Sequence, residues 1–173
     1  MNDIDLGRHS PSAVWEEHVH AEFVLKDADA ILRTMVAEPY VFCIPSGMCA
    51  KGRAEVREFY ARHFLPNIPS DLKLMPLSRA TGSDRLVEEF VVRFTHSIRM
   101  DWILPDLPPT GRKAEFVLVA VIGFRHGKVS HEHIHWDHAA LLGQLGFIDQ
   151  PFAHAGVTSA ARLLKLCDGF GVC

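Results

Sequence analysis

The spacing of apolar side chains divides the chain into a helical first part and a strand-rich second part. Apolar positions recur every three or four residues over 11–38 and again over 51–64, which predicts two helices followed by a third. A short apolar run at 40–44, closed by a Pro-Ser-Gly turn, predicts a strand between them.

The second part of the chain has the pattern of strands. It predicts extended segments at 72–81, 86–102, 113–124 and 129–137, and a short closing helix at 139–145. Helices first and strands afterwards favour an α+β domain in which a curved antiparallel sheet packs on three helices. Such a sheet can leave a pocket at its open end.

Length and charge limit the classes of protein that fit. The 173 residues suit one domain, 1–148, followed by an extension, 149–173, with a short predicted helix whose role stays open between lid, dimer contact and tail. A net charge of −3 favours neither nucleic acid nor an anionic membrane as partner. No secretory signal is visible and the four cysteines lack metal-binding spacing, so we expect free thiols in a cytoplasmic protein.

The segment 130–137, Ser-His-Glu-His-Ile-His-Trp-Asp, concentrates titratable side chains at the end of an apolar run. On a strand, its three histidines and Asp137 would project to one face, and Glu132 and Trp136 to the other. Burying four titratable groups on one face is costly unless they are paired or used. The histidine face is therefore the leading candidate for chemistry.

Asp137 is the first candidate for a general base in the pocket, supported by His133 or His135 as proton donors or tuning groups. The alternatives are an Asp137 that caps the helix beginning near residue 139 and histidines that are merely hydrogen-bonded, as we expect for His131. The histidines also suggest a metal site. However, the outer two would lie about 13 Å apart along the strand, so we expect no metal there.

Arg99, Asp101 and His96 form a second candidate group. Arg99 and Asp101 share a strand face and could polarise a reacting oxygen, if Asp137 approached the arginine from the neighbouring strand; otherwise they form an ion pair of little value. His96 lies on the opposite face unless a bulge intervenes, so it remains a secondary acid/base candidate.

Several large side chains could contact an apolar substrate, although each could equally belong to the core. On the first helix, Glu22 lies four residues after His18 and on the same side of the helix, but its side chain is expected in solvent. The candidates for substrate contact are Trp15, His18, Phe42, Tyr60, Trp102 and Trp136.

Three short motifs, in their order, resemble the NTF2-like superfamily and in particular its SnoaL-like branch. They are Gly-Arg-Ala-Glu-Val at 52–56, Gly-Lys-Val at 127–129 and Trp-Asp at 136–137, and the resemblance extends over about 12–148. It implies a cone-shaped α+β fold with an apolar pocket in which a histidine or aspartate moves protons, generally without a metal.

A local similarity to limonene-epoxide hydrolase, another branch of that superfamily, rests on Arg-Met-Asp at 99–101 and the loop after it. By that resemblance Asp101 protonates an epoxide oxygen, Arg99 bridges the two acids and Asp137 activates water. Phe42 and Ile44 stand where that enzyme has a tyrosine and an asparagine.

Together these observations predict an acid/base enzyme without a cofactor, acting on a small apolar organic molecule. Isomerisation, cyclisation, dehydration and epoxide opening all remain open, because a fold does not choose among reactions. The alternatives are a non-catalytic module that binds a hydrophobic ligand and a scaffold whose histidines are structural. A homodimer formed through the outer face of the sheet is expected.

Overall fold

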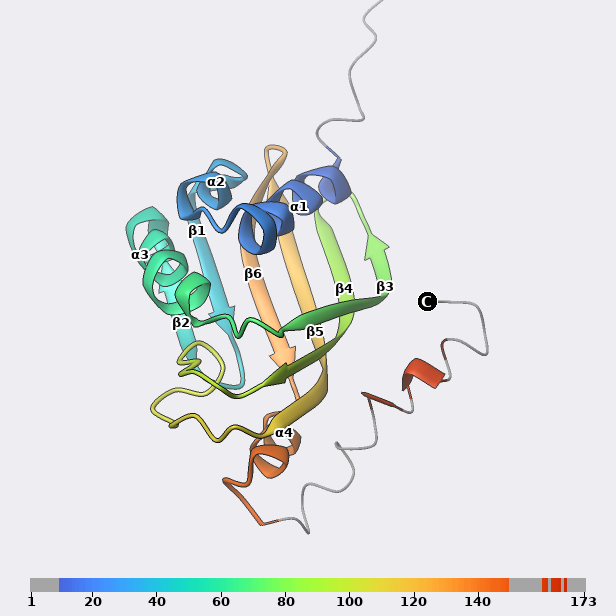
Figure 1. Ribbon diagram of the computed structural model, residues 1–173. Coiled ribbons are helices and arrows are strands. Elements are labelled where there is room, and N and C mark those ends of the chain that lie inside the picture. Colours follow the sequence, from blue (N-terminus) through green and yellow to red (C-terminus); the bar gives the residue numbers. More distant parts are fainter. Residues whose placement is uncertain (1–9, 150–159, 162, 166, 168–173) are drawn as a thin grey trace, which may run out of the picture.

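The computed structural model describes residues 10–149, 160–161, 163–165 and 167, and it has a curved, unclosed sheet with helices on one face (Figure 1). Six strands pair in the order β2-β1-β6-β5-β4-β3. The strands are β1 (Met35–Cys43), β2 (Met48–Lys51), β3 (Lys73–Thr81), β4 (Arg85–Thr95), β5 (Lys113–Arg125) and β6 (Lys128–Trp136). The predicted α+β class is confirmed.

The helices carry the caps that their sequences predict. Ser10 accepts a hydrogen bond from the Ala13 N–H at the start of α1, and Asp27 caps α2 in the same way. Two of the α-helices continue into π-helical turns, Ala21–Leu25 and Phe59–Phe64. The α-helices are α1 (Pro11–His20), α2 (Ala28–Arg33), α3 (Gly52–Glu58) and α4 (His138–Leu145), and a 3₁₀ turn spans Leu65–Asn67.

The sheet is mixed, which corrects the expectation of a purely antiparallel one. β1 and β6 run parallel, and the other neighbouring pairs are antiparallel. After β2 the chain crosses one face as α3 and its π-helical turn and re-enters the sheet at the far edge as β3 (Figure 1). The meander β3-β4-β5-β6 then fills the sheet back to β1, and its last strand meets β1 in parallel.

Two predicted boundaries were wrong. The second helix was expected to reach residue 38, but α2 ends at Arg33 and Met35 already pairs with Val129 of β6. The strand expected over 86–102 ends at Thr95, because the backbone of His96 bonds to residues 110–112 and closes a long loop at its base. Tertiary pairing overrode local pattern in both places.

The outer face of the sheet is partly covered by the chain itself. Ala160 is fully buried against Leu77 of β3 and Val91 of β4. These two side chains lie on the opposite face from Phe90 and Val92, which face the helices. The expected homodimer stays a prediction, and most of the predicted 149–173 extension lies outside the described residues. No helix in the described part of the chain is both long and apolar enough to cross a membrane.

The cysteines differ from one another. Cys43 and Cys49 are free thiols, as expected, whereas Cys167 is disulfide-bonded, so the expectation of free thiols was wrong there. Cys43 is buried on β1, and burial raises the pKa of its thiol. A thiol held protonated in this way is a packing group rather than a nucleophile.

Candidate active site

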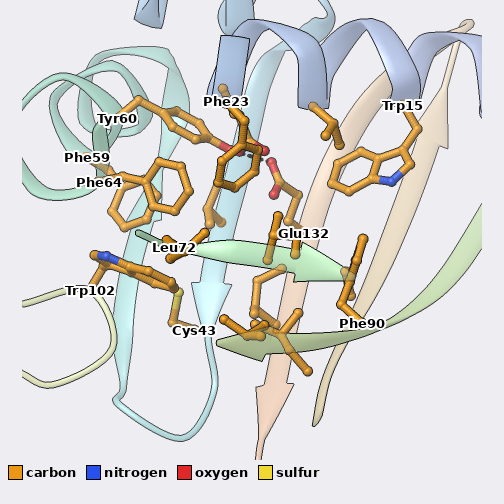
Figure 2. A pocket seen from close by; sticks show the side chains of 18 residues that line it. Trp15, Phe23, Cys43, Phe59, Tyr60, Phe64, Leu72, Phe90, Trp102 and Glu132 are labelled. Atoms are coloured by element: carbon orange, nitrogen blue, oxygen red, sulfur yellow. Dashed lines mark hydrogen bonds between the residues drawn. The ribbon is translucent and has the colours of Figure 1, made fainter. Parts of the chain in front are cut away.

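A cavity of about 70 Å³ lies between the helices and the sheet (Figure 2). Its walls come from α1, the two π-helical turns and the inner faces of β1, β3, β4, β5 and β6. Among the described residues, Glu22 and Glu132 are the only charged side chains that line it. Its aromatic lining is Trp15, Phe23, Phe59, Tyr60, Phe64, Phe90 and Trp102.

His18 lies behind the two carboxylates and is completely buried. Its Nε2 is 3.2 Å from Oε1 of Glu132 and 3.5 Å from Oε1 of Glu22. Its Nδ1 is 2.7 Å from the hydroxyl oxygen of Thr34. That hydroxyl donates its own proton to the Ile31 carbonyl over 2.6 Å, so toward the imidazole it can only accept.

Both ring nitrogens of His18 therefore face acceptors, which is the pattern of a protonated imidazolium. Burial alone would lower the pKa of His18. The charge of Glu132 and its hydrogen bond, together with Glu22, outweigh that effect and raise the pKa from 6.5 to about 10. The buried histidine is a fixed positive charge at neutral pH.

Tyr60 ties the carboxylate of Glu132 to the helical layer. Its phenol donates a 2.7 Å hydrogen bond to Oε1 of Glu132, and Figure 2 shows the hydroxyl pointing at that carboxylate. Burial and the neighbouring charge of Glu132 hold the pKa of Tyr60 well above 10. Tyr60 is therefore a neutral donor, and Oε1 of Glu132 is contacted by two groups, the phenol of Tyr60 and Nε2 of His18.

Glu22 is the second carboxyl group of the cluster, and burial raises its pKa even though His18 opposes the shift. The π-helical turn that follows α1 places it here, since such turns rotate side chains relative to an α-helix and are frequent at functional sites. One imidazolium balances one carboxylate, so ionising both carboxyl groups would leave a net negative charge in the wall of the cavity.

The ligand atoms of His18, Glu22 and Glu132 lie within 4.8 Å of one another, close enough to hold a metal ion. One imidazole and two carboxylates suit zinc or manganese, and His18 would first have to release its Nε2 proton. The hydrogen bonds described above satisfy the same atoms. This cluster differs from the three histidines of β6, which were considered as a metal site from the sequence alone. The expectation that the protein has no metal stays a prediction.

Trp15 forms the wall beside His18. Its ring stacks on the imidazole at a centroid separation of 5.2 Å and an interplanar angle of 17°. Its indole N–H donates a 2.6 Å hydrogen bond to Glu88, which is buried on β4 and paired with Arg79. The indole is thus held at its edge while its face covers a cation, an arrangement that favours the charged imidazole.

The histidine face of β6 points away from the cavity, so its predicted orientation was wrong. Tyr40 of β1 accompanies it on the outer face: its ring stacks on His131 and its hydroxyl is 2.8 Å from Nε2 of His133. His131 also covers Gly123, where a Cβ would collide with the ring. His135 shares this face by alternation.

Asp137 is exposed and caps α4, accepting a 2.9 Å hydrogen bond from the Ala140 N–H. The capping alternative is therefore what the structure shows, because the strand ends at Trp136 and the aspartate begins a helix. Phe42 and Trp136 were predicted to contact a substrate but do not line the cavity: Phe42 lies on the outer face, and Trp136 donates its indole N–H to His138.

Arg99 and Asp101 form a 2.9 Å ion pair in the loop after β4, with Arg99 half exposed. They do not line the cavity, and no contact joins Arg99 to Asp137 among the described residues. His96 is fully buried outside the cavity, with Nδ1 3.3 Å from the Thr110 hydroxyl, and its Nε2 has no hydrogen-bond partner in the part of the chain that the structure describes. The residues expected to form one centre are therefore dispersed.

Of the predicted contact residues, Trp15, Tyr60 and Trp102 line the cavity, and His18 bonds to groups that do. Sequence reasoning missed Glu132 and Glu22. A usable signal existed for Glu132, because its face also carries the apolar Ile134 and Trp136 and is therefore the buried one.

The comparisons with known proteins agree with this architecture. The sequence matches the SnoaL-like domain over residues 13–132. The structure of TsrD from Streptomyces laurentii has 19% sequence identity to this chain and a TM-score of 0.64. The match covers 83% of this chain and 100% of that chain. A proposed SnoaL-like polyketide cyclase from Jannaschia sp. CCS1 shares 14%, with coverage of 87% and 99% and a TM-score of 0.63.

AclR, a proposed hydroxylase from Streptomyces galilaeus, shares 19% identity, with coverage of 92% of this chain and 95% of that chain and a TM-score of 0.60. A comparison with curated protein sequences finds no match. These solved structures support the NTF2-like fold, and the sequence match covers most of the domain. The chain belongs to the SnoaL-like domain family.

Proposed function

We propose that this protein is an acid/base enzyme that moves a proton on a small, largely apolar organic molecule bound in the cavity. Glu132 is the proposed base. The single observation that carries the proposal is a carboxylate at an aromatic cavity wall, held by Tyr60 at 2.7 Å and by His18 at 3.2 Å. Both described donors bind Oε1, so Oε2 is the oxygen available to a substrate.

The apolar walls serve this chemistry by excluding water, so that the field of a buried ion pair acts undiminished on a bound molecule. The imidazolium of His18 is a positioning group: it stabilises the ionised form of Glu132 before the reaction. When Glu132 accepts a proton, the charge of His18 favours its return to the substrate at another atom. Isomerases, cyclases and lyases share that step, and we place the protein in this group.

Epoxide opening of the limonene-epoxide hydrolase kind has less support. The residues that carried the resemblance, Arg99, Asp101 and Asp137, lie outside the cavity. Glu132 would have to supply the activated water, with a proton donor other than the Arg-x-Asp pair.

Hydrogen exchange into small cyclic ketones tests the proposal without knowledge of the natural substrate. We expect the protein to accelerate deuterium uptake at the carbon next to the carbonyl of cyclopentanone or cyclopentenone in D₂O, followed by NMR. Loss of a general base typically costs about 10²–10⁴-fold, so Glu132→Gln should remove most of the acceleration. Glu17→Gln, on the exposed side of α1, is the matched control.

Wild-type exchange rates in the Glu132→Gln protein would exclude Glu132 as the base. If both proteins bind the ketones equally and neither accelerates exchange, a non-catalytic binding module becomes the better interpretation. Thermal unfolding of each variant establishes that the fold is retained.

A further inference from the structure

The cavity has more carboxyl groups than positively charged groups. Two carboxyl groups, Glu22 and Glu132, face the same small space, and His18 supplies one positive charge. The described lining contains no lysine or arginine. If both carboxyl groups were ionised, the buried cluster would carry a net negative charge.

The walls of the cavity are rich in aromatic rings, which can accommodate a cation. Phe23, Phe64 and Trp102 present aromatic rings to the cavity on the side of Tyr60, and Trp15 presents one on the opposite side (Figure 2). The rings of Phe23 and Phe64 meet edge to face at 5.9 Å, as do those of Phe64 and Trp102 at 5.0 Å. Aromatic faces attract ammonium groups, the more so when water is excluded.

We propose that the cavity binds a small organic cation, a protonated or quaternary amine on an apolar body, with Glu22 as the anchoring carboxylate. This inference rests on the proposed function for the location of the site and names the class of its substrate. The ammonium would take the place of a proton on Glu22, whose pKa is raised by burial. His18, Glu132, Glu22 and the ligand then form a neutral set of four charges.

The arrangement divides the work between the two carboxylates. Glu22 reaches the cavity from the π-helical turn of α1, and its closest described charge partner, His18, is 3.5 Å away, beyond a short ion pair. His18 and Tyr60 also hydrogen-bond to Glu22. The His18 contact with Glu132 is nevertheless the shorter one, 3.2 Å against 3.5 Å, so we assign the ligand's ammonium to Glu22, the carboxylate that His18 holds less closely. An ammonium anchored there would hold the adjacent carbon of the ligand toward Glu132.

The cavity limits the size of the cation. At about 10–15 Å³ for each water molecule, 70 Å³ holds roughly five to seven waters, which suits a single small ring. Cyclopentylamine and cyclopentanol are a matched pair of probes, because they differ only in an ammonium for a hydroxyl group. Calorimetry and the fluorescence of Trp15 and Trp102 both report their binding.

We expect the amine to bind at least about tenfold more tightly than the alcohol at pH 7.5, because the amine adds a charge-assisted bond to Glu22. Binding should release about one proton per site, measured by calorimetry in two buffers of different ionisation enthalpy. In Glu22→Gln the preference for the amine and the proton release should both disappear while the alcohol still binds. Glu17→Gln should behave like the wild type.

Equal or weaker binding of the amine, or no binding of either probe, would overturn the inference. So would an amine preference that survives in Glu22→Gln, since the charge would then act elsewhere. The proposed function has a separate readout, because exchange into neutral ketones depends on Glu132 and not on Glu22. Loss of that exchange with intact amine binding would therefore reject the enzyme and keep the cation site.

Discussion

The phenol of Tyr60 and the carboxylate of Glu132 are 72 positions apart in sequence and 2.7 Å apart in space. The first belongs to the π-helical turn after α3 and the second to the middle of β6, so the bond joins the helical layer to the sheet at the cavity wall. Both side chains are almost completely buried. The bond therefore matters for stability as well as for the site.

Tyr60→Phe should lower the free energy of unfolding by about 1–3 kcal/mol, because the buried carboxylate loses a neutral donor that water cannot replace. Urea unfolding at pH 7 measures the change. The other tyrosine provides the control: Tyr40 contacts His133 on the half-buried outer face, so Tyr40→Phe should cost clearly less. Equal losses in the two variants would contradict a special role for the Tyr60 bond.

The charge of His18 predicts how stability changes at alkaline pH. Its pKa is about 10 in the folded protein and 6.5 in the unfolded chain. The stability that it contributes is therefore fully present below pH 6.5 and is lost as the pH rises through 10. The raised pKa of Glu22 acts in the same direction above its ordinary value.

The free energy of unfolding of the wild type should fall between pH 7 and pH 10, and that of His18→Gln should fall less steeply. His20→Gln, at an exposed position on the same helix, should keep the wild-type slope. Parallel curves for the wild type and His18→Gln would show that the imidazole is not charged in the folded protein.

Much of the fold followed from the sequence because local signals and tertiary packing agree there. The Ser-Pro start of α1, the Asp27 cap and the alternation of β4 and β5 all identify elements that the structure contains. Where the signals were ambiguous, packing decided. Met35 fits a helical stripe equally well, but it pairs with β6.

The site was harder to predict. Side chains alternate between the two faces of a strand, and this alternation does not by itself say which face is buried. The alternation correctly separated Glu132 from the histidines of β6. The choice between the faces then rested on the chemistry of histidine rather than on Ile134 and Trp136, which mark the inner face. Glu22 was assigned to solvent because a lone glutamate on a helix usually is, and a π-helical turn is not visible in sequence.

His96 predicts the response to acid. Burial lowers the pKa of this imidazole, whose Nε2 has no partner among the described residues. A histidine with a lowered pKa stabilises the fold above pH 6.5, and that stability is lost as the pH falls below 6.5, because the unfolded chain then takes up the proton more readily. The pKa values of His131 and His133 are lowered as well, so His96 accounts for only part of the loss of stability in acid.

His96→Leu should reduce the loss of stability between pH 7 and pH 5, with little change at pH 7 because it removes an unsatisfied buried nitrogen. Unfolding by urea at several pH values measures this, and His20→Gln again serves as the exposed control. A variant that remains as acid-sensitive as the wild type would remove His96 from the explanation.

Variants of Asp137 distinguish the helix-capping role seen in the structure from the catalytic role that its position in the sequence suggested. Its carboxylate accepts the Ala140 N–H at 2.9 Å and faces solvent rather than the cavity. Asp137→Ala should therefore lower the free energy of unfolding by about 1 kcal/mol, and Asp137→Asn, which keeps a capping oxygen, should cost less. Neither change should alter deuterium uptake by cyclopentanone, because Glu132 and His18 remain in place. If Asp137→Asn abolished exchange while the protein stayed folded, the base would have to be sought at the end of β6 instead of within the cavity.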